Sequence, residues 1–176
     1  LELKNITMLE RCINLIIELG IKKILLNTFH LEKEIIQFIE NKKFSVDIRI
    51  IKDGRKILNT GGGILNMIKN SKENDFLIFN PDTLWNNDYI KEINKMNDFY
   101  FSNNLNNVLL LTDKEKSFDK NLKGDFNLIN NLLIKDGEKN FIYIGCQILS
   151  RSLFKGYDIY NFSISEIWDD LIKKKE

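Results

Sequence analysis

The least ordinary stretch of the sequence is a run of small residues, Asn59, Thr60, Gly61, Gly62 and Gly63. Adjacent glycines remove every Cβ where a loop enters a helix, so a flat group such as a nucleobase could lie against the backbone there. The run is not a P-loop, because no Gly-Lys-Ser/Thr follows it. It is not the dinucleotide fingerprint either, because Asn66 stands where the third glycine belongs. A strained turn without a ligand is the alternative explanation.

A second candidate is Asp82, in the stretch Asn80-Pro81-Asp82-Thr83 that follows the apolar residues 76–79. If these apolar residues form a strand, Asp82 lies at the carboxyl edge of the sheet, where open α/β sheets bind ligands. A carboxylate there can hold Mg²⁺, which proteins bind through one or two carboxylates together with substrate phosphates. The ordinary alternative is a turn residue whose side chain bonds to its own backbone.

The other reactive side chains predict no second site. His30 is the single histidine and opens a helix, which is typical of a structural role. Cys12 and Cys146 stand alone, without a C-x-x-C motif, and we expect them to be buried free thiols. Trp85 and Trp168 are expected in the core, since no interleaving of aromatic and basic residues indicates a nucleic-acid surface.

Composition favours a soluble protein. The 176 residues, 43% of them hydrophobic, suffice for one domain that buries a core without disulfides or a structural metal. A net charge of +1 argues against nucleic acid or a membrane surface as the main partner. Apolar runs stay well short of the roughly 20 residues that a spanning helix needs. The first residues lack the pattern of a signal peptide, so we expect a cytoplasmic location.

Candidate residues of this kind need an α/β sheet to position them, and the apolar periodicity predicts one. Thr7 is expected to cap the first helix and Gly20 to end it. Alternation of helices and strands indicates a Rossmann-like three-layer sandwich with a mostly parallel central sheet and right-handed crossovers. The predicted helices are 8–19, 31–39, 61–68 and 89–96, and the predicted strands are 21–27, 46–51, 76–79 and 108–111.

The second half of the sequence predicts a small antiparallel section. Its expected strands are 125–130, 131–135 and 141–149, with Asn130-Asn131 as a candidate turn and Asp136-Gly137 as a stronger one. Ser163 is expected to cap a last helix whose inward residues are Ile167, Trp168 and Leu171. Neither a repeat nor a linker divides the sequence, so we expect a single domain over residues 1–176.

Four stretches, taken in order, resemble the hexose-1-phosphate nucleotidyltransferases. Within that family the likeness is strongest to the N-acetylmuramate-1-phosphate uridylyltransferases and their mannose-1-phosphate guanylyltransferase-like relatives, which read N-x-x-H-L, L-E-T-G-G-G-I, N-G-D and G-D-F. Order and spacing agree over nearly the whole chain. The matching stretches are Asn27-Thr28-Phe29-His30-Leu31, Leu58-Asn59-Thr60-Gly61-Gly62-Gly63-Ile64, Asn80-Pro81-Asp82-Thr83 and Gly124-Asp125-Phe126.

The resemblance implies the nucleotide-diphospho-sugar transferase fold and a site. Asp82 would be a ligand of the catalytic Mg²⁺, residues 59–63 would border the nucleobase, and Gly124 and Gly145 would lie near the sugar phosphate. The implied reaction joins the nucleoside monophosphate of UTP or GTP to a sugar 1-phosphate: a sugar phosphate oxygen attacks the α-phosphorus in line and pyrophosphate leaves.

The sequence also departs from the family. Pro81 replaces the usual Gly and Asn59 the usual Glu, so contacts to the base are expected to differ. The family's G-x-G-T-R loop and Lys-Pro pair would precede Leu1, and its second metal-binding Asp would follow Glu176. The resemblance therefore implies a domain incomplete at both ends, with an exposed gap in its parallel sheet and weak or absent turnover of the chain alone.

Several functions stay open at this stage. The favoured one is uridylyl transfer to N-acetylmuramate 1-phosphate in peptidoglycan recycling, and mannose-1-phosphate guanylyl transfer is the alternative. A different class is a non-catalytic subunit that binds a nucleotide or a sugar phosphate. A purely structural explanation of the glycines and Asp82 would be favoured if Asp82 were buried and bonded away from any cleft. The sequence leaves the sugar, the base and the oligomeric state undetermined.

Overall fold

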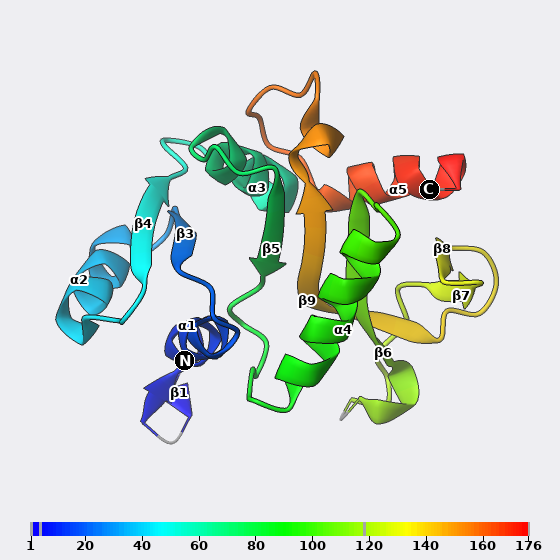
Figure 1. Cartoon of the computed structure of the whole chain (residues 1–176), viewed down its shortest axis with the longest axis horizontal. Coiled ribbons are helices and arrows are strands. Elements are labelled where there is room, and N and C mark those ends of the chain that lie inside the picture. Colours follow the sequence, from blue (N-terminus) through cyan, green and yellow to red (C-terminus); the bar gives the residue numbers. More distant parts are fainter. Residues whose placement is uncertain (1, 4, 118, 176) are drawn as a thin grey trace.

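The structure is a computed structural model that describes residues 2–3, 5–117 and 119–175. Helices alternate with short strands, as expected, and cover two faces of a twisted sheet region (Figure 1). Within the described part of the chain, no helix has the length and apolar content required to cross a bilayer. The α-helices are α1 (Met8–Glu18), α2 (Glu32–Lys42), α3 (Asn59–Lys69), α4 (Tyr89–Ser102) and α5 (Ile164–Lys174).

The strands and short 3-10 helices complete the element order. They are β1 (Glu2–Leu3), β2 (Ile6–Thr7), β3 (Lys23–Thr28), β4 (Asp47–Lys52), β5 (Asp75–Phe79), β6 (Asn107–Asp113), η1 (Lys114–Lys116), β7 (Asn127–Ile129), β8 (Leu132–Ile134), β9 (Phe141–Ser150) and η2 (Arg151–Phe154). Most predicted elements are confirmed within a few residues. The largest difference in length is α4, which continues to Ser102 because Tyr100 still faces the core.

Helix α1 forms where the sequence predicts it. The Thr7 side chain accepts a hydrogen bond from the Glu10 backbone at 3.0 Å and so satisfies a free donor of the first turn. Gly20 follows the last turn with φ of +80°, and its N–H donates to Ile17 at 2.9 Å. Ile13 and Leu15 are buried on the inner face, which fixes the helix against the strands.

Among the described residues, the parallel pairing lies in a two-stranded sheet, and the larger sheet is antiparallel. Strands β3 and β4 pair in parallel, with Lys23 opposite Asp47 and Thr28 opposite Lys52. Strand β9 lies between β5 and β6 and is antiparallel to both. The antiparallel component therefore sits at the centre of the larger sheet. In the part of the chain that the structure describes, β3 and β5 share no ladder, which is the gap that the resemblance implied (Figure 1).

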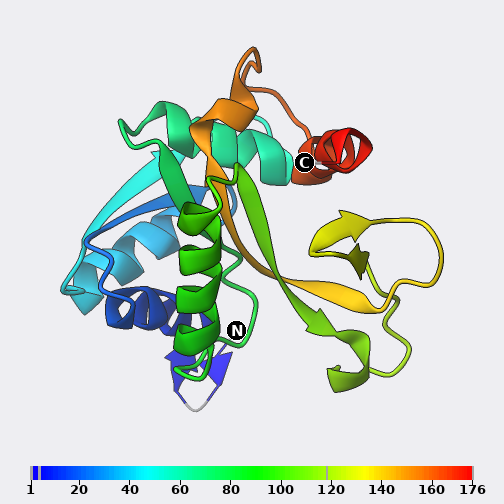
Figure 2. The same cartoon turned by 45° about the vertical axis from the view of Figure 1, so that its right-hand side comes forward.

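A small hairpin forms at one of the two predicted turns. Strands β7 and β8 pair antiparallel across Asn130 and Asn131, whose φ values of 52° and 66° suit a two-residue hairpin turn. At Asp136-Gly137, the stronger predicted turn, the chain does bend, with φ of 75° at Gly137, but the flanking strands form no hairpin because β9 pairs with β5 and β6. The physical reason is burial: residues 145–149 of β9 are all buried, which a central strand achieves and a hairpin edge does not. The hairpin projects from the body of the molecule (Figure 2).

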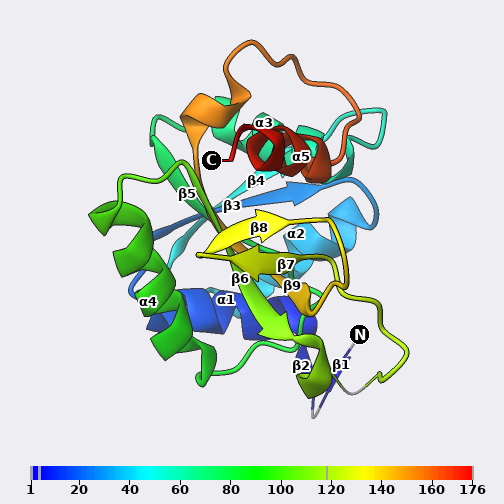
Figure 3. The ribbon, with the colours of Figure 1, turned by 90° about the vertical axis from the view of Figure 1, so that its right-hand side faces the viewer.

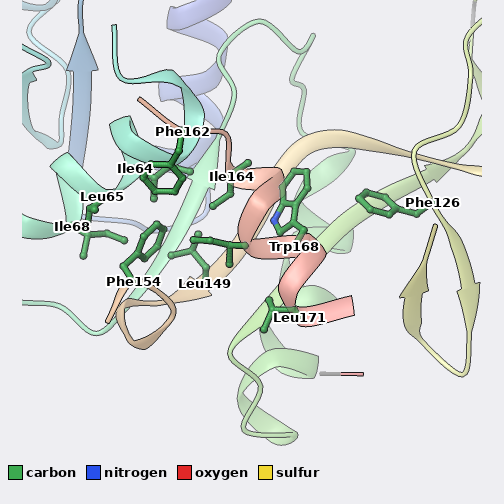
Figure 4. Packing of buried hydrophobic residues seen from close by; sticks show 11 residues of the cluster. Ile64, Leu65, Ile68, Phe126, Leu149, Phe154, Phe162, Ile164, Trp168 and Leu171 are labelled. Carbon is green, nitrogen blue, oxygen red and sulfur yellow. The ribbon is translucent and has the colours of Figure 1, made fainter. Parts of the chain in front are cut away.

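A core between α3 and α5 supports the end of β9 (Figure 4). Ile64 and Leu65 of α3 lie beside Phe162, and Leu149 of β9 lies in the same cluster. Helix α5 starts with a complete capping box between Ser163 and Glu166, as its N-terminal sequence predicts. Its inward residues are those expected, Ile167, Trp168 and Leu171, with exposed fractions of 4%, 9% and 9%.

A second core lies between α1, α4 and the other end of β9. It contains both cysteines, which are buried and free as predicted. Trp85 is also buried there, and its ring packs edge-on against Phe79 and Tyr89 with 5.0 Å between ring centroids in each case. The prediction that Trp85 and Trp168 are core residues is confirmed.

Candidate functional site

Asp82 lies in a loop that is anchored on both sides. The backbone N–H of Asn80 donates to the Gly145 carbonyl at 2.7 Å, and the Thr83 hydroxyl donates to the Ile144 carbonyl at 2.8 Å. Trp85 donates its Nε1–H to the Asn80 carbonyl at 2.8 Å. Asp82 itself is exposed, and within the described residues its carboxylate accepts no hydrogen bond. A turn in which Asp82 bonds its own backbone is therefore not what forms.

Gly145 is required by this anchoring. Its φ is +86°, and a Cβ added there would lie 2.8 Å from the Asn80 Cβ and 3.0 Å from the Thr83 hydroxyl oxygen. Any side chain would thus be strained and would press on the loop that holds Asp82. The structure brings Gly145 and the Asp82 loop into contact. Such contact is needed if both are to bind one substrate. The assignment of substrate binding to Gly145 stays a prediction.

The glycine run forms the first turn of α3 and packs against the segment before α5. A Cβ on Gly61 would meet the Phe162 ring, and one on Gly62 would collide with the Tyr160 carbonyl oxygen. The N–H groups of both glycines donate to the Phe162 carbonyl, at 2.9 and 3.3 Å. The space and the donors at these two glycines are therefore used by the chain itself. A role of residues 59–63 in binding a nucleobase stays a prediction.

Asn59 and Thr60, at the start of the run, make local bonds. Asn59 has φ of 59°, and its side-chain oxygen accepts from the Thr60 N–H at 2.7 Å. The Thr60 hydroxyl accepts from the Ile164 N–H at 3.0 Å, which ties α3 to the start of α5. Both residues are exposed, so their outer surfaces are accessible to a ligand.

A polar network beside Gly63 was missed by sequence reasoning. Asn27 donates to Asp53 at 3.0 Å, and Asn66 donates to the other Asp53 oxygen and to the Lys52 carbonyl, each at 3.1 Å. A Cβ on Gly63 would lie 2.9 Å from the Asn27 amide nitrogen. The signal was available: Asn27 is the second-last residue of β3 and Asp53 directly follows β4, so both lie at the carboxyl edge of one parallel pair.

Gly124 packs against Lys139, before the start of β9, and its assignment to substrate binding stays a prediction. A Cβ there would collide with the backbone carbonyl of Lys139, so this glycine also permits a close approach of two segments. Next to it, the Asp125 N–H donates to the Phe141 carbonyl at 2.7 Å, and the Asp125 side chain accepts from the Tyr143 N–H at 2.9 Å. Gly124 therefore borders the start of β9, while Gly145 lies further along this strand.

The donor set at Asp82 fits Mg²⁺ only as part of a complex with substrate. Among the residues that the structure describes, no three His, Cys, Asp or Glu side chains converge to hold a metal. One exposed carboxylate at a strand end matches the way Mg²⁺ is held jointly by protein and phosphates, and does not match an all-protein cage. His30 is exposed in the loop after β3.

The two thiols are unsuited to nucleophilic chemistry. Burial raises the pKa of Cys12 from 9.0 to about 12, and burial also raises the pKa of Cys146 well above its ordinary value. The reactive form of cysteine is the thiolate, so both residues stay protonated and inert near neutral pH. The candidate chemistry therefore rests on the carboxyl edge of the sheets and its loops.

The fold matches several solved structures. HddC from Yersinia pseudotuberculosis is 22% identical with a TM-score of 0.64, over 88% of this chain and 67% of that one. The inositol-1-phosphate CTP transferase from T. maritima is 8% identical with a TM-score of 0.75, over 95% of this chain and 69% of that one. UDP-glucose pyrophosphorylase in complex with UDP-glucose is 11% identical with a TM-score of 0.73, over 96% of this chain and 75% of that one.

These similarities establish the nucleotide-diphospho-sugar transferase fold for this chain, as the sequence motifs predicted. No protein-family model matches the sequence, and no curated protein matches it.

Proposed function

We propose that the chain is the core of a nucleotidyltransferase that joins a nucleoside monophosphate to a sugar 1-phosphate and releases pyrophosphate. One observation carries the proposal: Asp82 is an exposed carboxylate after β5, on a loop bonded to Gly145 of β9. The solved proteins with this fold include enzymes named for transfer of CTP to inositol 1-phosphate and for UDP-glucose.

The chemistry asks the protein mainly to position and screen the reactants. An oxygen of the sugar phosphate attacks the α-phosphorus of the triphosphate in line, the bond to the β-phosphate breaks, and pyrophosphate leaves. Asp82 would hold Mg²⁺, which neutralises charge on the phosphates when bound. The bonds of Asn80 and Thr83 to β9 anchor the loop that carries the exposed Asp82 carboxylate. The network of Asn27, Asp53 and Asn66 presents fixed dipoles beside Gly63.

For the substrates we propose UTP and N-acetylmuramate 1-phosphate, which would place the protein in peptidoglycan recycling in the cytoplasm. The four motifs in register support this choice, with GTP and mannose 1-phosphate as the alternative pair. Pro81 and Asn59 are the positions where this chain departs from the family's motifs, so they are the first to examine for base preference.

One observation favours a second candidate, a non-catalytic subunit that binds a nucleotide or a sugar phosphate. The Phe162 carbonyl already accepts hydrogen bonds from the Gly61 and Gly62 N–H groups, so these two donors are not available to a reacting nucleotide. Such a protein would bind nucleotide or sugar phosphate at Asp82 without turnover.

A pyrophosphate-release assay with Mg²⁺ tests the proposal. Each of UTP and GTP is paired with N-acetylmuramate 1-phosphate and with mannose 1-phosphate. We expect release with one pair, weak or absent from this chain alone and clear from a version extended upstream and downstream. Asp82→Ala in the extended version should lose roughly 100-fold or more, since single electrostatic contacts to such transition states are often worth ~3 kcal/mol. Asp88→Ala, another exposed carboxylate nearby, is the control. Nucleotide binding without pyrophosphate release would favour the non-catalytic subunit. The absence of both nucleotide binding and pyrophosphate release would refute both proposed functions.

A further inference from the structure

Helices α3 and α5 lie beside each other (Figure 3), and their N-termini exchange hydrogen bonds. Leu58, the N-cap residue of α3, provides no side-chain hydrogen bond, and the Phe162 carbonyl accepts the Gly61 N–H at 2.9 Å instead. In return, the Thr60 hydroxyl accepts the N–H of Ile164, the first residue of α5, at 3.0 Å. Each of these bonds satisfies a backbone donor that the first turn of a helix leaves free.

Two further hydrogen bonds hold the segment before α5 along the start of α3. The Phe162 N–H donates to the Leu58 carbonyl at 3.2 Å, and the Asn161 side chain donates to the Ile57 carbonyl at 2.8 Å. The Phe162 ring is buried and lies beside Ile64 of α3 (Figure 4). Hydrogen bonds in both directions and a buried ring therefore fix the start of α5 against the start of α3.

Helix α5 is also fixed to β9, the strand that supports the Asp82 loop. The Trp168 Nε1–H donates to the Gln147 side-chain oxygen at 3.1 Å, and both side chains are buried. Gln147 lies two residues along β9 from Gly145, whose carbonyl accepts the Asn80 N–H of the Asp82 loop. A continuous chain of contacts therefore runs from the first turn of α3 through α5 and β9 to the Asp82 loop.

We propose that Thr60 is a positioning residue that fixes residues 59–63 relative to the Asp82 loop. The inference rests on the proposed function, in which residues 59–63 border the base and Asp82 holds Mg²⁺. In-line transfer depends on this placement, because a misplacement of about 1 Å can cost roughly 100-fold in rate. The Thr60 hydroxyl already accepts the Ile164 N–H, so its role is to hold α5 and not to contact the nucleotide.

Hydrogen exchange of this chain tests the placement without requiring activity. Thr60→Val removes the acceptor at nearly constant shape, and we expect roughly three- to tenfold faster exchange of the Ile164 amide and, through β9, of the Asn80 amide. Residues 47–52 of β4 lie outside the chain of contacts and should exchange as in wild type. Thr60→Ser keeps the hydroxyl and should restore protection. The matched control, Thr28→Val, removes a buried hydroxyl without a partner among the described residues and should change neither amide.

A second variant breaks the chain of contacts further along, between α5 and β9. Trp168→Phe removes the indole donor to Gln147 and should speed exchange of the Asn80 amide while the Ile164 amide stays protected. Faster exchange at Ile164 alone in Thr60→Val would show that the bond acts only locally, and it would overturn the proposal. Equal acceleration in β4 would overturn it as well, because it would indicate a general loss of stability.

Kinetics of the extended version separate positioning from direct contact with the nucleotide. Thr60→Val should lower kcat roughly tenfold and leave the KM for the nucleotide unchanged, since only the alignment of the reactants is lost. A higher KM at unchanged kcat would assign Thr60 to the nucleotide and overturn the proposal. If the wild-type extended version turns over no pair of substrates, the proposed function fails, and exchange of the Asn80 amide still decides whether Thr60 fixes the Asp82 loop.

Discussion

Single residues at the candidate site differ in what they contribute, although many are glycines. Gly61 and Gly62 allow two segments of the chain to pack closely, while Gly145 allows β9 to support the loop of Asp82. Among residues 59–63, Asp82, Gly124 and Gly145, only Asp82 has a charge to offer a ligand. The proposed function therefore depends on this acid and on Gly145, which supports its loop.

Substitution of Gly145 should cost more stability than its backbone conformation alone explains. Gly145→Ala adds overlap with Asn80 to the cost of a left-handed residue, whereas Gly156→Ala, with φ of 87° and open space around it, carries the backbone cost alone. We expect a loss of about 1–2 kcal/mol for Gly156→Ala and a further loss of about 1–3 kcal/mol for Gly145→Ala. Urea unfolding of both variants measures the difference, and equal losses would contradict the account of the contact.

Residue positions in the site could be predicted only in part. Asp82 was placed correctly because a compact apolar run followed by Asn-Pro-Asp predicts a strand end. The network of Asn27, Asp53 and Asn66 was not predicted, since its members come from three elements that only the folded chain brings together. The occupied donors of Gly61 and Gly62 were likewise invisible, because Phe162 lies about a hundred residues away in the sequence.

Helices were easier to predict than strand partners. Thr7 and Ser163 are local signals, since each cap acts within its own first turn. The apolar run of β9 signals burial but says nothing about which strands will pair with it. Asp136-Gly137 is a local turn signal, which cannot show that β9 pairs with the distant strands β5 and β6 instead of forming a hairpin there.

The contact between α3 and the segment before α5 can be tested by two neighbouring substitutions. Gly62→Ala would collide with the Tyr160 backbone carbonyl, which cannot move alone, whereas Gly61→Ala would meet the Phe162 side chain. Replacing glycine with alanine in a helix gains up to about 1 kcal/mol in helix propensity. The net loss of stability is therefore the cost of the steric overlap minus this gain. We expect Gly62→Ala to be more destabilising by roughly 1 kcal/mol or more.

Shortening the Phe162 side chain distinguishes the contact at Gly61 from the contact at Gly62. Phe162→Leu should reduce the additional cost of Gly61→Ala in a double-mutant cycle, because it removes the atoms that the new methyl group meets. It should not reduce the cost of Gly62→Ala. Rescue of both substitutions to the same extent would show that the contact is not specific. Thermal or urea unfolding of the three single and two double variants provides the measurement.

The whole molecule combines a fold of nucleotidyltransferases with a sheet in two parts. Asp82 follows β5, and the Asp53 network lies where β3 and β4 end, so both lie at the carboxyl ends of strands. The general fold was predictable from four motifs in register, and the gap followed from the resemblance rather than from any local pattern.

Stability of the whole chain should fall at alkaline pH. Burial raises the pKa of Cys12 from 9.0 to about 12, and it raises the pKa of Cys146 and Tyr143 further. The folded state then keeps protons that the unfolded state releases, so the contribution is complete below pH 9 and decreases as the pH rises through the folded pKa values. Each group contributes a slope of up to about 1.4 kcal/mol per pH unit.

Urea unfolding between about pH 7 and about pH 11 measures how the free energy of unfolding depends on pH. The variant Cys12→Ala should be less stable than wild type at pH 7 because it removes buried volume, but it should lose stability less steeply above pH 9. A free energy of unfolding that stays constant across the alkaline range would contradict the buried, protonated state of these side chains.

Calorimetric binding of UDP-N-acetylmuramate, the proposed product, with and without Mg²⁺ most directly tests whether Asp82 holds the metal of a nucleotide-sugar site. The account predicts binding that requires Mg²⁺, a loss of roughly tenfold or more in Asp82→Asn, and unchanged binding in Asp88→Asn. Because Asp82 is exposed, its substitution should leave the unfolding free energy unchanged. Binding that is indifferent to both Mg²⁺ and Asp82, or the absence of binding by this and by GDP-mannose, would contradict the account.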